Sequence, residues 1–388
     1  MGILLPIIII VLCCIIIWRA SDGFEASSDY LGRNLSDGVR GATINAIASS
    51  MPELFTTIFF LIYLKDTEGF SGGIGTTAGS AIFNGMIIPA LVILVVITAG
   101  ITKNITVSKK VILRDGLALI AAEIILIFSI SGTTLYWWHG LILMVTYAAY
   151  IIIMFSTMNS SQQEEVEEEE EEEEDENVGI LKGLVTLNLE AVFVGDKEIT
   201  SARAWTLLLT SMSIIGIACL MLVSACEMLG TDTYSFMGLE GLHGLDIPIL
   251  FVAVILASAA TSVPDTIISM KDAKRGKYND AISNALGSNI FDICFALGFP
   301  LFLYTLFYGP IQMDPDTIKF STELRVLLLI LTIVAFFVYI YGKKMGLSKA
   351  LILIGIYIFF TSYIVALNME ADWALQISNM IYDIPIFK

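Results

Sequence analysis

The sequence contains one six-residue pattern twice, as Ala48-Ser49-Ser50-Met51-Pro52-Glu53 and as Ala260-Thr261-Ser262-Val263-Pro264-Asp265. In both copies a small residue is followed by two hydroxyl residues, an apolar residue, proline and an acid, and the copies lie 212 positions apart. A second pattern occurs as Gly79-Ser80-Ala81-Ile82-Phe83-Asn84 and as Gly287-Ser288-Asn289-Ile290-Phe291-Asp292, 208 positions apart. The chain is therefore predicted to contain two related halves.

Every copy of these patterns lies inside a long apolar segment. The chain has 388 residues, of which 56% are hydrophobic and 15% are charged, whereas soluble domains carry about 25% charged residues. Apolar segments of about 20 residues, long enough to cross a bilayer as helices, recur along the whole length. We predict an all-α polytopic membrane protein with ten transmembrane helices. The predicted spans are 3–25, 42–64, 75–100, 111–131, 136–156, 204–229, 246–270, 281–308, 322–342 and 349–368.

An acidic segment separates the two halves. Residues 164–176 contain 12 acidic side chains and so account for most of the net charge of −17. Because this segment has almost no apolar content to bury, we expect it to be a disordered, solvated linker. Five predicted spans precede it and five follow it, and an odd number of crossings in each half inverts the second half relative to the first. We predict a first five-helix repeat at 1–157, an acidic linker at 158–203 and a second five-helix repeat at 204–388.

The positions of the basic residues predict the orientation in the membrane. If the N-terminus is outside, 17 of the 21 Lys and Arg residues lie in or beside cytosolic loops. This excess is what the positive-inside rule describes. Both termini are then predicted to lie outside, and the acidic linker is predicted to be cytosolic.

Three acids, Glu53, Asp265 and Asp292, lie in the middle of predicted spans, with Asn84 as a neutral fourth member of the set. An ionisable side chain at the bilayer centre costs from about 3 to more than about 10 kcal/mol. No Lys or Arg is predicted at a comparable depth, so a bound cation is the simplest partner for these acids.

The prolines predict how such a site is built. Pro52 and Pro264 each precede an acid and cannot donate a backbone hydrogen bond, so the carbonyl oxygens near Ala48 and Ala260 are freed. Irregular backbone at membrane depth is tolerated where it lines an enclosed or water-filled cavity. Inverted repeats whose broken helices meet at the midplane are typical of secondary transporters.

The predicted ligands are all oxygen atoms, which favours a hard cation. The carboxylates and the Asn84 amide are joined by hydroxyl groups from Ser49, Ser50, Ser80, Thr261, Ser262 and Ser288. Ca²⁺ takes about 6–8 oxygen ligands in flexible geometry, and Na⁺ accepts the same donors. The five cysteines lie in apolar spans and the chain has only two histidines, so we expect neither a disulfide framework nor a zinc site.

These motifs resemble those of the calcium/cation antiporter superfamily, whose two inverted repeats carry Gly-Thr-Ser-apolar-Pro-Glu and Gly-Ser-Asn patterns. The second repeat is most similar to the potassium-dependent sodium/calcium exchanger branch, which also has Asp after the second proline and the same 27-residue step from Asp265 to Asp292. The sequence departs from the usual motif at Ala48 and Ala260, where Gly is typical, and at Ser49, where Thr is more usual.

The resemblance implies a secondary antiporter, not an enzyme, that exchanges Ca²⁺ for Na⁺. It implies that Glu53 and Asp265 are the central Ca²⁺ ligands, flanked by Asn84 and Asp292, with the serines and nearby carbonyls forming Na⁺ positions. Asp292 is the position linked to potassium dependence in that branch. The resemblance also implies a plasma-membrane location, with the bilayer and the transported ions as partners, and with no prosthetic group or nucleic acid.

Three alternatives remain open at this point. A cation/proton antiporter would use the same carboxylates as proton acceptors, since burial favours the protonated form of an acid. An intramembrane aspartyl protease would also place two acids at mid-depth, but it would not need repeated hydroxyl-Pro-acid motifs, and the sequence has no Gly-x-Gly-Asp motif. A passive channel or a receptor would not require acids in both halves.

Overall fold

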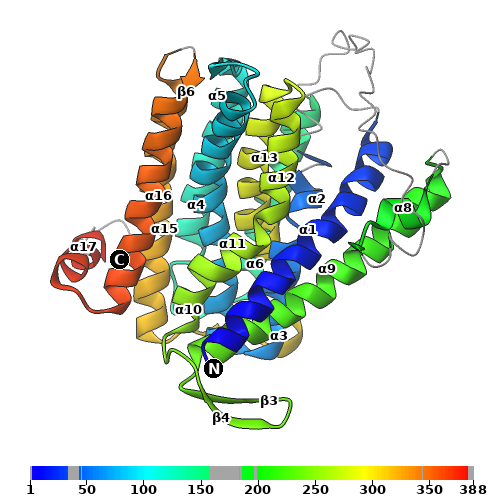
Figure 1. Cartoon of the computed structure of the whole chain (residues 1–388). Helices are drawn as coiled ribbons and strands as arrows, with labels where there is room; N and C mark the ends of the chain where they lie inside the picture. The colour runs from blue at the N-terminus through cyan, green and yellow to red at the C-terminus, as the bar shows by residue number, and fades with distance from the viewer. Residues whose placement is uncertain are drawn as a thin grey trace.

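The computed structural model describes residues 2–33, 43–44, 46–156, 183, 186–195, 199–342 and 344–382. The chain forms a bundle of long helices, with three short two-stranded ladders near the helix ends (Figure 1). The acidic run at 164–176 lies outside the described residues, so the disordered linker stays a prediction.

Eight helical segments in the described part of the chain are long and apolar enough to cross a membrane. The prediction of a helical, polytopic membrane protein is therefore confirmed. Six of the segments match predicted spans directly, and two are composite. The eight segments are α1 (Leu4–Gly32), α4 (Asp66–Thr98), α6 (Trp137–Ser156), α9 (Ser201–Gly230), Ile249–Lys274, Tyr278–Tyr308, α15 (Pro315–Ile340) and α16 (Leu347–Asn368).

Two predicted spans are not among these eight, so the count of ten stays a prediction. The span predicted at 42–64 is split at Ser50, whose φ of −92° and ψ of 9° leave the helical range, and the helix after the break has 13 residues. The span predicted at 111–131 is a 21-residue helix with charged residues in its first turns. The remaining α-helices among the described residues are α2 (Ala46–Ser49), α3 (Met51–Tyr63), α5 (Lys109–Ser129), α8 (Leu189–Phe193) and α17 (Asp372–Tyr382).

The two composite segments are interrupted where the repeated motifs lie. Their parts are α10 (Ile249–Val252), the π-helix η2 (Ala253–Ala257), α11 (Ser258–Thr261) and α12 (Val263–Lys274), and then α13 (Tyr278–Phe291), the π-helix η3 (Asp292–Ala296) and α14 (Gly298–Tyr308). Ser262 breaks the first segment as Ser50 breaks its counterpart, and in both cases proline is the second residue of the new helix. Proline suits the first turn because its missing N–H is not needed there. Short π-helical turns are frequent at functional sites.

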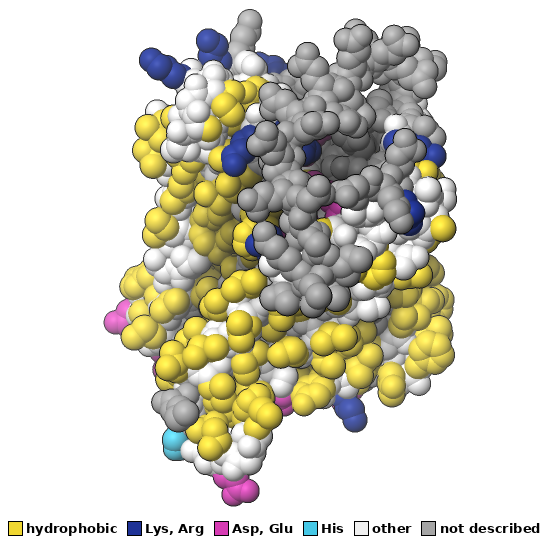
Figure 2. Space-filling model, turned by 45° about the vertical axis from the view of Figure 1, so that its right-hand side comes forward, with side chains coloured by type: hydrophobic (Ala, Val, Ile, Leu, Met, Phe, Trp, Pro, Cys, Tyr) yellow, Lys and Arg dark blue, Asp and Glu magenta, His cyan; other side chains and the backbone are white. Residues whose placement is uncertain are grey.

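The core of the bundle is α4, which packs against α3, α12, α13, α15, α16 and η2. Close approach requires small residues on α4: a Cβ atom at Gly79 would overlap the carbonyl oxygen of Val254 in η2. Helices α1 and α9 pack against each other along the outside of the bundle (Figure 1). Figure 2 shows a broad surface band of hydrophobic side chains, with most Lys and Arg side chains in the upper half of the view.

Two of the ladders join one half of the chain to the other. Strand β1 (Asn104–Ile105), just before α5, pairs with β6 (Met345–Gly346), just after α15. Strand β2 (Thr134–Leu135), just after α5, pairs with β5 (Ile311–Gln312), just before α15. The two ladders therefore lie at opposite ends of the packed helices α5 and α15. The third ladder is a hairpin of β3 (Thr233–Phe236) and β4 (Leu239–His243).

The sequence reasoning missed two short helices. Helix α8 lies within the predicted linker and packs on α1 and α9. Helix α17 follows the last predicted span and packs on α15 and α16, where Ser378 donates a hydrogen bond to Glu323 Oε2 at 2.5 Å. Neither helix has the length that a search for membrane spans detects.

Candidate cation site

The two helix breaks bring two acids to corresponding places. Glu53 lies in the first turn of α3 and Asp265 in the first turn of α12. Negative charge is stabilised at a helix N-terminus, where the dipole is positive and the N–H groups are free. The Pro-acid pattern thus places each carboxylate at the end of a helix that begins inside the bundle.

A third acid completes the cluster. Glu53, Asp265 and Asp292 each have a carboxylate oxygen, and these oxygens lie within 4.8 Å of one another. All three side chains are fully buried. Asp292 is contributed by the first residue of η3. The three acids predicted to face one cation therefore share one place in the structure.

Ser80 of α4 links the two halves within this cluster. Its Oγ lies 3.0 Å from Glu53 Oε1, 3.0 Å from Asp292 Oδ2 and 2.9 Å from Ser262 Oγ. A hydroxyl group has one hydrogen to donate, so these oxygens cannot all be satisfied by Ser80.

The remaining predicted residues surround Asp265 and the two breaks. Asn84 Nδ2 donates to Asp265 Oδ2 at 2.8 Å, and Ser288 Oγ donates to Asp265 Oδ1 at 2.6 Å. Ser49 Oγ lies 3.5 Å from Ser288 Oγ. Thr261 interacts with Glu53, and Ser50 interacts with Asp292. All ten residues singled out from the sequence thus belong to one connected polar network.

The network is rich in acceptors and poor in donors. Glu53 Oε2, Asn84 Oδ1 and Asp292 Oδ1 are buried without a hydrogen-bond partner. The ion pairs in the described part of the chain involve other acids. Buried charges are normally paired or bound to metal, and converging oxygens of this kind suit a hard cation.

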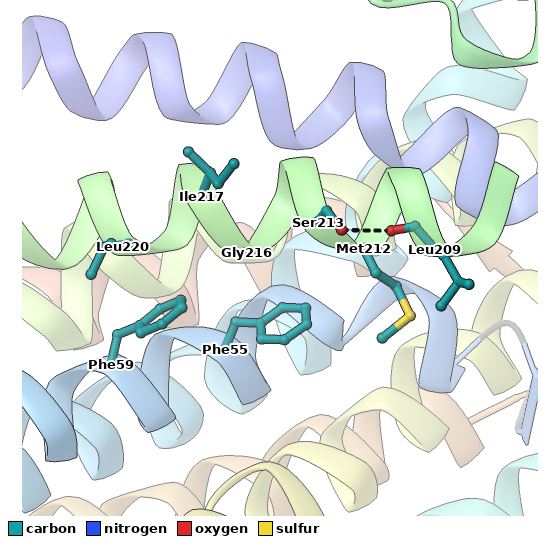
Figure 3. A pocket seen from close by; sticks show the side chains of 8 residues that line it. All are labelled: Phe55, Phe59, Leu209, Met212, Ser213, Gly216, Ile217 and Leu220. Atoms are coloured by element: carbon teal, nitrogen blue, oxygen red, sulfur yellow. Dashed lines mark hydrogen bonds between the residues drawn. The ribbon is translucent and has the colours of Figure 1, made fainter. Parts of the chain in front are cut away.

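An apolar groove lies between α3 and α9. Its volume is about 420 Å³, and Figure 3 shows its walls on α3 and α9. The lining residues are Phe55, Phe59, Leu209, Met212, Ser213, Gly216, Ile217 and Leu220. Its one side-chain hydroxyl, on Ser213, donates to the carbonyl oxygen of Leu209 at 2.8 Å. The groove therefore offers no carboxylate and does not resemble a cation site.

The sequence reasoning missed two other buried groups, Glu123 and Arg325. Glu123 of α5 is fully buried and accepts a hydrogen bond from Thr332 Oγ1 at 2.7 Å. Arg325 of α15 is 2% exposed and donates to the carbonyl oxygen of Ile127 at 3.2 Å. Neither residue belongs to a repeated motif, so the pattern that identified the site did not reveal them.

Comparison with known proteins places the chain among cation exchangers. A sequence profile described as "sodium/calcium exchanger protein" matches residues 5–156 and 203–366. Human sodium/potassium/calcium exchanger 5 is 46% identical over 63 residues, which are 16% of this chain and 12% of that protein. The Drosophila melanogaster sodium/potassium/calcium exchanger Nckx30C is 28% identical over 127 residues, which are 32% of this chain and 14% of that protein. The matched segments are thus a small part of these relatives.

Solved structures with the same fold cover nearly the whole chain. An H⁺/Ca²⁺ exchanger, CAX, aligns with 99% of this chain and 86% of its own, with a TM-score of 0.62 and 15% identity. The sodium–calcium exchanger NCX_Mj aligns with 92% of this chain and 97% of its own, with a TM-score of 0.55 and 20% identity. At these identities the likeness concerns the fold.

Proposed function

Because this chain belongs to the sodium/calcium exchanger family, we propose that it is a secondary antiporter that exchanges Ca²⁺ for Na⁺ across a membrane. The observation that carries this proposal is the buried cluster of Glu53, Asp265 and Asp292, whose carboxylate oxygens lie within 4.8 Å of one another. Such a cluster is stabilised by a cation of charge two or by several monovalent cations, which is what an exchanger must bind in turn.

The proposed Ca²⁺ ligands are the carboxylates of Glu53 and Asp265, flanked by Asn84 and Asp292. Hydroxyl groups and freed backbone carbonyls add the neutral oxygens that bring the total toward the about 6–8 that Ca²⁺ prefers. The same groups provide Na⁺ positions, and the hydroxyls involved are those of Ser49, Ser50, Ser80, Thr261, Ser262 and Ser288. Because Ca²⁺ and Na⁺ share these oxygens, binding of one ion excludes the other.

The proposed architecture is two inverted repeats of five spans, with α3 and α5 adding to the eight long segments. The hydrogen bond from Ser80 to Glu53 in the first half corresponds to that from Ser288 to Asp265 in the second. In the same way, β1 of the first half corresponds to β5 of the second, and β2 corresponds to β6. The β1–β6 ladder therefore corresponds to the β5–β2 ladder. Packing of α6 on α14 likewise corresponds to packing of α16 on α4. These correspondences support a pseudo-two-fold relation of the kind common in transporters.

Transport by alternating access requires part of the bundle to move around the site. Helices α1 and α9 pack mainly against each other, whereas α4 is held on all sides by the core. We assign the motion to the α1–α9 pair and the fixed ligands to the core helices. Rigid-body movement of one bundle against another is the usual way in which such transporters expose a central site to each side.

Two further ions, K⁺ and H⁺, are candidates for coupling to Ca²⁺ transport. The names of the matched relatives include potassium, and this supports K⁺ as an additional transported ion, with Asp292 as the residue that senses it. Proton coupling through the same carboxylates is the alternative function. The experiment below distinguishes these cases.

The protein is integral to the membrane, and we propose the plasma membrane as its location. Most of the Lys and Arg side chains visible on the face drawn in Figure 2 lie in its upper half, which supports placing that end in the cytosol. Both termini would then be outside, and the acidic linker would be cytosolic.

The decisive measurement is ⁴⁵Ca²⁺ uptake into proteoliposomes loaded with Na⁺, with and without K⁺, and with a pH gradient as a separate driving force. Uptake that requires internal Na⁺ is the expected result. A requirement for K⁺ would identify the potassium-dependent branch. Uptake driven only by the pH gradient would replace Na⁺ by H⁺, and absence of uptake under every condition would refute Ca²⁺ as the substrate.

A further inference from the structure

An ion pair joins the outer helix α1 to the core helix α12. Lys271 lies in the last turn of α12, and its Nζ atom is 2.9 Å from Asp22 Oδ1 and 3.3 Å from Glu25 Oε2. Asp22 and Glu25 both belong to α1, and their spacing of three positions places them on the same face of that helix. One ammonium group is therefore held by two carboxylates of a neighbouring helix.

The helix that carries Lys271 also carries a residue of the candidate cation site. Helix α12 has 12 residues, with Asp265 in its first turn and Lys271 in its last. Asp265 is fully buried, whereas the Lys271 side chain is 40% exposed. One short helix therefore connects the buried acids with a contact near the surface, where the chain turns at residues 275–277.

The ion pair lies toward one end of the α1–α9 pair. Tyr234, which follows α9, donates a hydrogen bond to the carbonyl oxygen of Gly2, so the start of α1 lies beside the end of α9. Asp22 and Glu25 lie toward the other end of α1 and contact α12 there (Figure 1). The ion pair is therefore on the side of the 275–277 turn, which the predicted orientation places in the cytosol.

A different contact occupies the corresponding place at the other end of the pair. At the repeat offset of 212, Lys271 corresponds to Phe59 of α3, and α3 packs on α9. The Phe59 ring lines the apolar groove between these two helices (Figure 3). A phenyl ring has no formal charge, so this position contributes packing and no ion pair.

The acid that corresponds to Asp22 faces a like charge. Residues 20–22 are Ala-Ser-Asp and residues 225–227 are Ala-Cys-Glu, so Asp22 corresponds to Glu227 of α9. Glu227 interacts electrostatically with Glu68, in the first turn of α4. Like charges repel, so this contact weakens the attachment of α9 to the core, whereas the ion pair strengthens the attachment of α1. The charges at these two places thus act on the helix pair in opposite directions.

We propose that the ion pair of Lys271 with Asp22 and Glu25 is a latch that holds the α1–α9 pair against the core on the side of the 275–277 turn. While the latch is closed, the cation site is shielded from that side of the membrane. When the latch opens, α1 moves away from α12 and the site is exposed there. This inference rests on the proposed alternating access and names the contact that must break on one side.

The exposure of the latch suits a contact that opens and closes. The side chains of Lys271, Asp22 and Glu25 are 40%, 31% and 13% exposed. Ion pairs that water can reach contribute little to stability, because hydration replaces most of the attraction when they separate. The latch can therefore bias the helix pair toward one position without fixing it there, as a reversible gate requires.

The test is the Ca²⁺ dependence of exchange measured separately from each side, in sealed vesicles of known orientation. Lys271→Glu brings three acids together and should favour the open latch. We expect the half-saturating Ca²⁺ concentration to fall about fivefold on the side of the 275–277 turn and to rise about fivefold on the other side. The two changes are opposite because a shift between two states favours binding from one side at the expense of the other.

Two further variants separate the latch from a general effect of charge. Lys274→Glu makes the same change three positions further along α12. Lys274 is exposed and lies outside the ion pairs found among the described residues, so this variant should not produce opposite changes on the two sides. Combining Lys271→Glu with Asp22→Lys restores opposite charges at the same place and should return both concentrations to near the wild-type values.

The outcomes separate the latch from the proposed function. No change in Lys271→Glu, equal changes in Lys271→Glu and Lys274→Glu, or no recovery when the charges are exchanged would overturn the latch. If the wild-type protein showed no exchange, the proposed function would fail, and hydrogen exchange of the purified protein would still test the contact. Faster exchange of the α1 amides around Asp22 and Glu25 in Lys271→Glu than in Lys274→Glu would support the latch, and equal exchange would refute it.

Discussion

Replacing Glu53 by Gln removes one negative charge from the cluster and keeps the shape and one oxygen acceptor of the side chain. Two unit charges about 4 Å apart interact by about 4 kcal/mol at an effective dielectric constant near 20. Because Ca²⁺ carries two charges and desolvation offsets much of the attraction, we expect a net loss of about 3 kcal/mol, or about 100-fold in Ca²⁺ affinity. The charge that is removed belongs to a fully buried side chain, so solvent does not screen its interaction with Ca²⁺.

The assay combines transport with ligand-induced stabilisation. Wild-type protein should show Na⁺-driven ⁴⁵Ca²⁺ uptake and a melting temperature that rises with Ca²⁺, as expected for a ligand that binds the folded state. Glu53→Gln should lose both the uptake and the rise in melting temperature with Ca²⁺. Without Ca²⁺ its melting temperature should be no lower than that of the wild type, because fewer buried charges repel each other. The matched control is Glu123→Gln, an equally buried glutamate bonded to Thr332, which should retain exchange. Normal uptake by Glu53→Gln, or an equal loss in Glu123→Gln, would refute the assignment.

Three further predictions concern other parts of the same structure. Asp292→Asn should change the K⁺ requirement of uptake while preserving folding; an unchanged requirement in a K⁺-dependent wild type would remove Asp292 from that role. Ser80→Ala removes the hydroxyl shared between the two halves and should raise the half-saturating Ca²⁺ concentration by about tenfold, since a hydrogen bond to a charged group contributes about 1.5–3 kcal/mol; an unaltered concentration dependence would contradict this. Gly79→Ala should lower the free energy of unfolding by about 1–3 kcal/mol because its Cβ overlaps Val254. Gly216→Ala, where a Cβ meets nothing within 4 Å, should melt like the wild type, and equal melting of the two variants would argue against the close packing of α4.

The site was accessible to sequence reasoning because its residues repeat. A single acid beside a proline in the middle of an apolar segment is a weak indication of a binding site. The indication becomes specific when the same pattern recurs with the same neighbouring residues. Glu123 and Arg325 have no counterpart in a repeated motif, and the composition of their segments is like that of the other spans. Their burial could therefore not be inferred from the sequence.

The sequence by itself determined the membrane class and predicted two related halves and the three acids of the candidate site, because these follow from local composition and from spacing along one chain. Only the tertiary structure decided that Ser80 lies between Glu53, Asp292 and Ser262. It also decided that the helices break at Ser50 and Ser262. Residues such as Ser80 and Asp292, 212 positions apart, meet only when separate helices pack, and that packing depends on side-chain shapes from both halves at once.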